Sequence, residues 1–231
     1  GFHTLEYLIF LNGNPRDISS ISSRQKEYIY YVTKKLLDDT VRLWAEWHGE
    51  KAISDQRDAE LIENDEITLA GGEDGFAELL RNPNMYQKYK TQTQVLEEII
   101  DNGLCNIANE VGTQKIGNPY REQDVYAVES WYSFNSLDDY ENNIISIENS
   151  YLGGPAATRK SETSMSAYVA SKNSDLDAEI TKAISDARKA IRDIPAPFRD
   201  QVTTGNVAPI DTAMYKLAEL NKSLIKNKSV L

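Results

Sequence analysis

The segment SLDDYENNIISIENSY, residues 136–151, carries the clearest structural pattern in the chain. Its large apolar residues follow one another in alternating steps of three and four, at Leu137, Tyr140, Ile144, Ile147 and Tyr151. This spacing places one apolar stripe along a helix, as in helices that pack side by side in a bundle. A Gly-Gly-Pro sequence at residues 153–155 predicts the end of the helix.

Similar patterns on both sides of this segment predict further helices. A capping box at Ser22 and Gln25 begins a long helix. Asn84, Ser174 and Asp211 are placed to cap others. Strand patterns are scarce, so the sequence predicts an all-α fold of antiparallel helix bundles. The predicted helices span residues 2–11, 22–48, 84 to either 112 or 117, 136–152, 165–169, 174–194 and 211–224.

Composition excludes several classes of function. The chain has 231 residues with 36 acidic and 25 basic side chains, a net charge of −11 that repels nucleic-acid phosphates. Its single cysteine, Cys105, excludes an intrachain disulfide and lies in an apolar stripe, which predicts burial. No run approaches the ~18 apolar residues of a membrane span, so we expect none in this chain.

The chain opens on an apolar segment, GFHTLEYLIF at residues 1–10. It has neither the basic start nor the small-residue cleavage site of a signal peptide. Natural termini are usually solvated, so we expect that further residues precede Gly1 in the complete protein.

A possible metal site lies in this first segment. His3 and Glu6 are three residues apart, so both side chains share one helix face and can bind one ion. The alternative is an ordinary pair on a partly buried helix, because such pairs arise often by chance. The other histidine, His48, falls in the apolar stripe around Trp44 and is interpreted as a core residue.

The rest of the ligand set must then come from carboxylates, tyrosines or water. Such oxygen-rich sites suit iron, manganese or calcium better than structural zinc. A zincin motif is absent, because Tyr7 stands where the inverted motif requires histidine.

The opening segment resembles the GxHxxE signature of the imelysin family. This family includes the so-called insulin-cleaving metalloprotease and imelysin-like periplasmic proteins linked to iron uptake. Two later blocks also resemble the family, IANEVGTQKIGNPY at residues 107–120 and VESWYSFNSL at residues 128–137. The sequence IPAPF at residues 194–198 is similar to the C-terminal region of the family.

The resemblance implies two four-helix-bundle-like halves and a location in the periplasm or cell envelope, with a possible lipid anchor upstream. Family members carry many residues before the motif. The first half is therefore expected to be incomplete here, its other helices coming from an upstream segment or a second chain. We assign residues 1–118 to the first part and residues 119–231 to the second.

The resemblance also extends the candidate site. Glu110 and Glu129 lie in matching blocks and are predicted to join His3 and Glu6 as metal ligands. The alternatives are a surface carboxylate for Glu110 and a cap or ion-pair partner for Glu129. The hydroxyls of the second block are predicted to line the ligand, and its segment 129–136 is predicted to lie against the His3 helix. These hydroxyls belong to Ser130, Tyr132 and Ser133, beside the packing residues Trp131 and Phe134.

Three functions compete. The first is a non-catalytic envelope protein that binds a divalent or ferric ion, such as iron, and aids iron uptake. The second is a metallopeptidase, disfavoured because one histidine and no separate general base leave hydrolysis without its usual groups. The third is a metal-free helical module that binds a peptide or small ligand.

Overall fold

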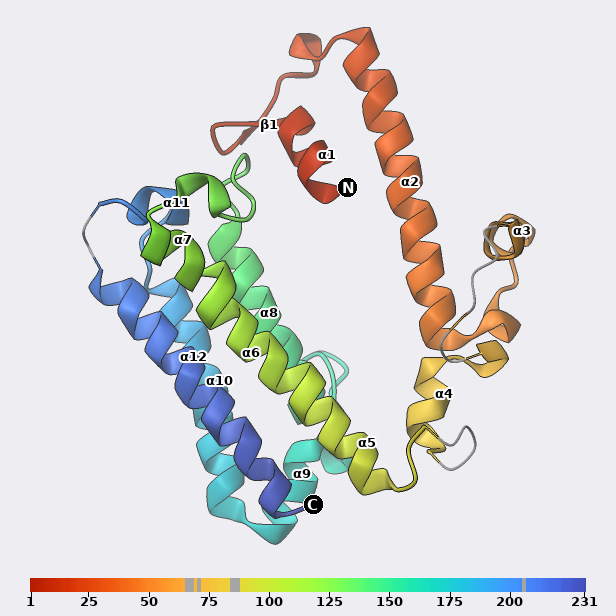
Figure 1. The fold of residues 1–231 in the computed structure, drawn as a ribbon, viewed down its shortest axis with the longest axis vertical. Helices are drawn as coiled ribbons and strands as arrows, with labels where there is room; N and C mark the ends of the chain where they lie inside the picture. The colour runs from red at the N-terminus through yellow and green to blue at the C-terminus, as the bar shows by residue number, and fades with distance from the viewer. Residues whose placement is uncertain (65–68, 70–71, 84–87, 205–206) are drawn as a thin grey trace. The chain divides into compact units, whose positions relative to one another are not determined.

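The computed structural model describes residues 1–64, 69, 72–83, 88–204 and 207–231 (Figure 1). In this part of the chain the fold is all-α, as predicted, with one short two-stranded ribbon. Two compact units divide the chain, Gly1–Val95 and Leu96–Leu231. No helix in the described residues is long and apolar enough to cross a bilayer.

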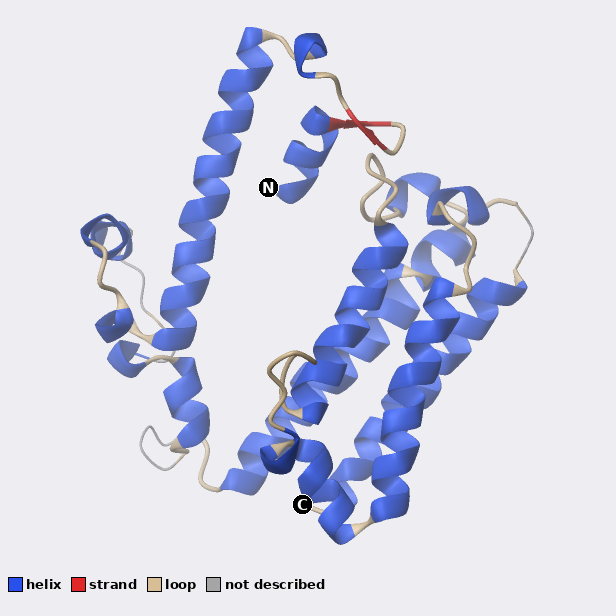
Figure 2. Cartoon of the chain, turned by 180° about the vertical axis from the view of Figure 1, so that it is seen from behind, coloured by secondary structure: helices blue, strands red, loops and turns tan. Residues whose placement is uncertain are grey.

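The second unit is a four-helix bundle. Its first rod is nearly continuous, with π-helical segments at Ile99–Cys105 and Val111–Lys115 joining three α-helices. Helix α10 packs against α8 and α12, and α6 packs against the same two helices, which closes the ring (Figure 2). The helices are the end of α5 (Gln92–Glu98, which crosses the boundary between the units), α6 (Asn106–Glu110), α7 (Gly117–Glu122), α8 (Ser136–Leu152), α9 (Met165–Lys172), α10 (Ser174–Arg192), α11 (Phe198–Gln201) and α12 (Ala208–Lys226).

The core of this bundle contains the predicted stripe of α8. Tyr140, Ile144, Ile147 and Tyr151 are all fully buried. Cys105 is buried as predicted, and burial raises the pKa of its thiol to about 11. The apolar spacing in the sequence therefore identified the face on which the bundle closes.

The first unit is built around one long helix, α2, which packs against α1, α3 and α4. Ser22 and Gln25 form the predicted capping box at its start, and Gly49 ends it. The elements are α1 (Phe2–Ile9), β1 (Phe10–Leu11), β2 (Asn14–Pro15), α2 (Ser23–His48), α3 (Gln56–Asn64) and α4 (Phe76–Arg81).

Several helix ends differ from prediction, and three of them have a clear local cause. Helix α1 stops at Ile9, because Phe10 turns extended and pairs with Pro15. Asn173, one residue before the expected cap, accepts the capping hydrogen bond of α10. Helix α12 begins at Ala208, so Asp211 lies in its first turn instead of capping it. The predicted cap Asn84 lies outside the described residues.

The interpretation of His48 as a core residue is wrong. His48 is exposed at the last position of α2, and its ring lies 4.8 Å from the ring of Trp44, centroid to centroid. The two rings share one stripe, as the spacing predicts, but in the described residues that stripe is not covered.

The predicted boundary at residues 118/119 falls within α7, inside the second unit. The π-helical segments continue the helical rod through this region, so α7 packs with the bundle that follows it. The assignment of residues 1–118 and 119–231 to separate domains stays a prediction.

Candidate functional site

The first predicted pair of ligands lies on α1. His3 and Glu6 share one face of the helix, and Nδ1 of His3 lies 3.5 Å from Oε2 of Glu6. The His3 side chain is 73% exposed and the Glu6 side chain 12%. Two donors that each lie about 2.1 Å from one ion are at most about 4.2 Å apart, so this pair can share an ion.

A lysine that the sequence analysis did not single out lies between the other two predicted ligands. Nζ of Lys115 is 3.4 Å from Oε2 of Glu129 and 3.9 Å from Oε1 of Glu110. It also donates a hydrogen bond to Oδ1 of Asn143 at 3.4 Å. The Lys115 side chain is only 18% exposed, so its charge requires these acceptors. Two carboxylates distant in sequence thus converge on one cationic group.

Glu110 and Lys115 meet because the helix between them is π-helical. Side chains five residues apart on an α-helix point about 140° away from each other. In Val111–Lys115 the hydrogen bonds instead span five residues, and the N–H of Ile116 donates to the carbonyl oxygen of Val111 at 3.0 Å. This wider turn brings positions five apart closer to one face, and such insertions are frequent at functional sites.

Helix α8 fixes the backbone beside this cluster. The hydroxyl of Tyr140 donates to the carbonyl oxygen of Lys115 at 3.0 Å. Burial, followed by the negative charge of Glu129, raises the pKa of Tyr140 far above its usual value. The phenol therefore stays protonated and remains a hydrogen-bond donor to Lys115.

Glu129 stands at the start of a tight turn that leads into α8. Its carbonyl oxygen accepts a hydrogen bond from the hydroxyl of Ser136. The hydroxyl of Ser130 donates to the carboxylate of Asp139, and the N–H of Phe134 donates to the carbonyl oxygen of Ser130 at 3.0 Å. The Ser130 hydroxyl thus has a structural partner within the turn.

The other two predicted hydroxyls lie in the same turn. Oγ of Ser133 is 3.5 Å from the carbonyl oxygen of Ser130. The ring of Tyr132 meets the ring of Trp131 edge-on at 5.2 Å, and Trp131 stacks on Tyr126 at 5.6 Å. The expected packing of Trp131 is confirmed, since it also packs against the core of the second unit.

The family model described as Imelysin matches residues 1–224. The chain belongs to the imelysin family. The model's label also names a peptidase family.

Individual imelysin relatives carry names linked to iron or to peptidases. Iron-regulated protein A of Synechococcus elongatus is 26% identical over 230 residues, which cover 97% of this chain and 56% of the relative. A crystal structure assigned as an iron-regulated protein A precursor from Parabacteroides distasonis has a TM-score of 0.80 and 31% identity, covering 99% of this chain and 63% of that one. An imelysin peptidase from Bacteroides ovatus has a TM-score of 0.67 and 37% identity, covering 84% and 51%. The chain therefore spans about half to just under two thirds of the length of these proteins.

The predicted metal ligands of this imelysin-family chain occur as two pairs, one in each unit. His3 and Glu6 belong to the first unit, and Glu110 and Glu129 to the second. Within the described residues, no group of three His, Cys, Asp or Glu side chains is placed to hold an ion. Each pair thus offers two donors, and in the second unit both carboxylates pair with the ammonium of Lys115.

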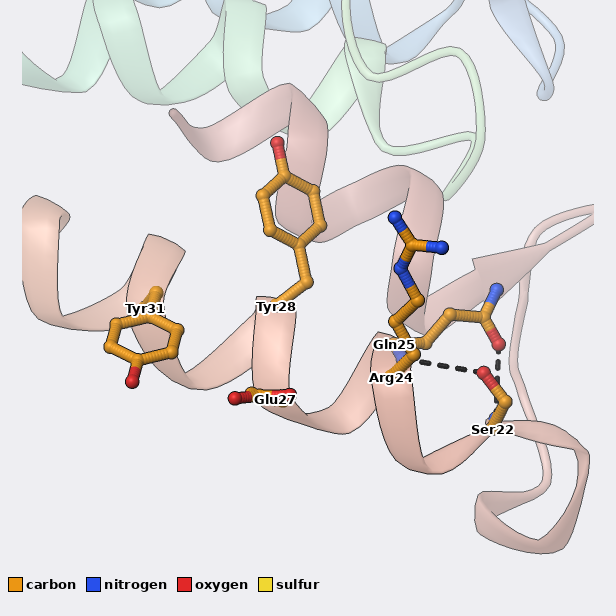
Figure 3. Close-up of a pocket in the computed structure, with 6 residues that line it drawn as sticks. All are labelled: Ser22, Arg24, Gln25, Glu27, Tyr28 and Tyr31. Atoms are coloured by element: carbon orange, nitrogen blue, oxygen red, sulfur yellow. Dashed lines mark hydrogen bonds between the residues drawn. The ribbon is translucent and has the colours of Figure 1, made fainter.

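A surface pocket of about 430 Å³ lies on the imelysin helix α2 (Figure 3). Arg24 and Tyr28 project from one side of the helix, whereas Tyr31 points away from them. Ser22 and Gln25 also line it, but their side chains form the capping box. None of the predicted site residues contributes to its lining.

Proposed function

We propose that this imelysin-family chain binds a metal ion and serves iron acquisition in the bacterial cell envelope. The position of Lys115 between Glu110 and Glu129 carries the proposal. Two carboxylates that hold one positively charged group provide oxygen donors that also suit a metal cation. The names of two compared proteins, both iron-regulated protein A, support iron as the metal.

The GxHxxE helix supplies a second pair of proposed ligands. His3 and Glu6 offer an imidazole nitrogen and a carboxylate oxygen 3.5 Å apart. We propose His3 and Glu6, like Glu110 and Glu129, as metal ligands, since imidazole and carboxylate donors suit iron or manganese. We assign the hydroxyls of Ser130, Tyr132 and Ser133 to the lining of the ligand as part of the same proposal.

The cell-envelope location and the lipid anchor belong to the proposal as well. The compared proteins are longer than this chain, and we propose that helices from outside it, in an upstream segment or a second chain, complete the first half of the molecule. Fractionation of cells that express the complete protein tests the location, because a periplasmic or lipid-anchored protein separates from the cytoplasmic fraction.

Calorimetric titration of manganese, and of ferrous iron without oxygen, tests metal binding on untagged protein. We expect Glu129→Gln and His3→Ala each to weaken binding by at least ~10-fold. Glu122→Gln is the matched control, because it removes the same charge from an exposed position at the end of α7.

Absence of binding by the unaltered chain would overturn the proposal, and so would equal affinity in Glu129→Gln. The family label and the name of the Bacteroides ovatus structure make a peptidase the second candidate. Cleavage of unfolded polypeptides that chelators block and Glu6→Gln abolishes would support that candidate instead.

A further inference from the structure

The side chain of Arg199, on the short helix α11, lies between two aromatic rings. Its guanidinium carbon is 4.2 Å from the ring centroid of Trp131 and 4.2 Å from that of Phe134. Its Nη1 also donates a hydrogen bond to the carbonyl oxygen of Trp131 at 3.4 Å. A planar cation between two rings holds both rings in place, since each ring face attracts its positive charge.

The turn that contains Trp131 and Phe134 has two residues with an unfavourable backbone conformation. Ser130 has a φ of 51° and Phe134 a φ of 64°, in the left-handed region that side chains other than glycine seldom occupy. A bulky residue such as Phe134 keeps this conformation only when its surroundings fix it. Arg199 contacts the rings of both Trp131 and Phe134, so one side chain links two positions of the turn.

Helix α11 also contacts Tyr140, the residue that holds the backbone of Lys115. Phe198, the neighbour of Arg199, is buried and meets the ring of Tyr140 edge-on at 5.6 Å. Tyr140 in turn donates to the carbonyl oxygen of Lys115. Two consecutive residues of one short helix thus contact the supports of both Lys115 and the turn that begins at Glu129.

We propose that Arg199 is a positioning residue for Glu129. Through Trp131 and Phe134 it holds the turn in which the Glu129 carboxylate stays 3.4 Å from Nζ of Lys115. Its role in metal binding rests on the proposed function above, whereas its role in placing Glu129 does not. Lysine at this position keeps the charge but lacks the plane that fits between two rings.

The test compares Arg199→Met and Arg199→Lys with the unaltered chain. Arg192→Met is the control, since it removes one arginine charge from a 56% exposed side chain whose ion-pair partner is Glu141 on α8. The first readout is a crystal structure of each variant. We expect Glu129 and Lys115 to lie beyond 4 Å in Arg199→Met, the pair to be partly restored in Arg199→Lys, and no change in Arg192→Met. An intact pair in Arg199→Met would overturn the proposal.

The second readout is manganese affinity measured by calorimetry. We expect a loss of about 10-fold in Arg199→Met, as for other residues that orient a ligand, and a smaller loss in Arg199→Lys. Unchanged affinity in Arg199→Met would overturn the role in binding. If the unaltered chain binds no manganese while Glu129 and Lys115 separate in Arg199→Met, the proposed function fails and the positioning role stands. If Arg199→Met does not fold, Arg199→Lys decides by the same two measurements.

Discussion

Helices α10 and α2 show how differently the two units use amphipathic helices. Helix α10 has 19 residues and buries six of them, Leu176, Ile180, Ile184, Ala187, Ala190 and Ile191. Helix α2 has 26 residues, of which Ala45 is the one buried within the helix. Both carry an apolar stripe, so the difference lies in the helices available to cover it.

The uncovered stripe of α2 has the spacing of a bundle helix. Tyr30, Leu37 and Trp44 follow one another every seven residues and are 64%, 53% and 42% exposed. A repeat of seven places these side chains along the side that faces another helix in a bundle. Exposed apolar patches of this kind mark interaction surfaces. The pattern supports the proposal that helices from outside this chain complete the first half.

The largest predicted effect on stability comes from comparing a substitution in the buried stripe of α8 with one in the exposed stripe of α2. Ile144→Ala removes a fully buried side chain of α8 and should lower the free energy of unfolding of the second unit by about 2–5 kcal/mol. Leu37→Ala, at an exposed position of α2, should change it by less than about 0.5 kcal/mol.

Cys105 provides a probe for this measurement, because it is the single cysteine and is buried in the second unit. With the pKa of its thiol raised to about 11, about a thousandth of it is thiolate at pH 8. A thiol reagent should therefore label Cys105 only as the unit opens, and faster in Ile144→Ala. Equal labelling rates in the two variants would contradict the contrast between the stripes.

The next effect concerns the ion pairs that join α10 to α8. Arg188 donates to Glu141 at 2.8 Å and also pairs with Glu148. Its side chain is 25% exposed, so Arg188→Met should cost about 1.5–3 kcal/mol of unfolding free energy. Lys189→Met is the control on the same helix, because Lys189 is 69% exposed and should cost little.

Lowering the pH tests the ion pairs of Glu148 in a second way. Burial pushes the pKa of Glu148 up, but hydrogen bonds from Arg159 and Arg188 outweigh it and lower that pKa below its usual 4.5. A carboxyl whose pKa is lowered by folding stabilises the folded chain above its unfolded pKa and loses this effect as the pH falls through the folded value. The unfolding free energy should therefore fall below about pH 4.5. Urea denaturation across that range should show a smaller fall in Arg188→Met, and an equal fall would contradict the assignment.

The sequence predicted the helices well and their ends less well. Apolar spacing identified the buried face of α8, because that face depends on a stripe that is local in sequence. The end of α1 depends on pairing between Phe10 and Pro15, and the cap of α10 depends on which of two neighbouring polar residues reaches Leu176. Such ends are decided by a single hydrogen bond, which residue preference does not resolve.

The sequence analysis predicted the acidic residues of the candidate site and did not single out the basic ones. Glu110 and Glu129 were predicted from the blocks that resemble the family, and their role as ligands stays a prediction. Lys115 lies in one of those blocks but has the wrong charge for a metal ligand, and its approach to Glu110 depends on a π-helical turn that apolar spacing does not reveal. Arg199 follows the IPAPF sequence, yet its stacking between two rings is a tertiary contact.

The smallest predicted effect compares the loss of one helix cap in each unit. The side chain of Ser22 accepts from the N–H of Gln25 at the start of α2, and that of Asn173 accepts from the N–H of Leu176 at the start of α10. Replacing either cap by alanine leaves N–H groups without acceptors and should cost about 0.5–2 kcal/mol of local helix stability.

The same local cost should have different consequences in the two units. Helix α10 is packed along its buried face, so its first turn cannot open without disturbing the core, and Asn173→Ala should shift the urea midpoint of the second unit. Helix α2 buries little of its surface, so Ser22→Ala should let its first turn fray while Cys105 labelling stays unchanged. Hydrogen exchange of the amides at residues 23–26 and 174–177 measures the two local losses. If Ser22→Ala speeds Cys105 labelling as much as Asn173→Ala does, α2 is coupled to the bundle core and the contrast between the two units is wrong.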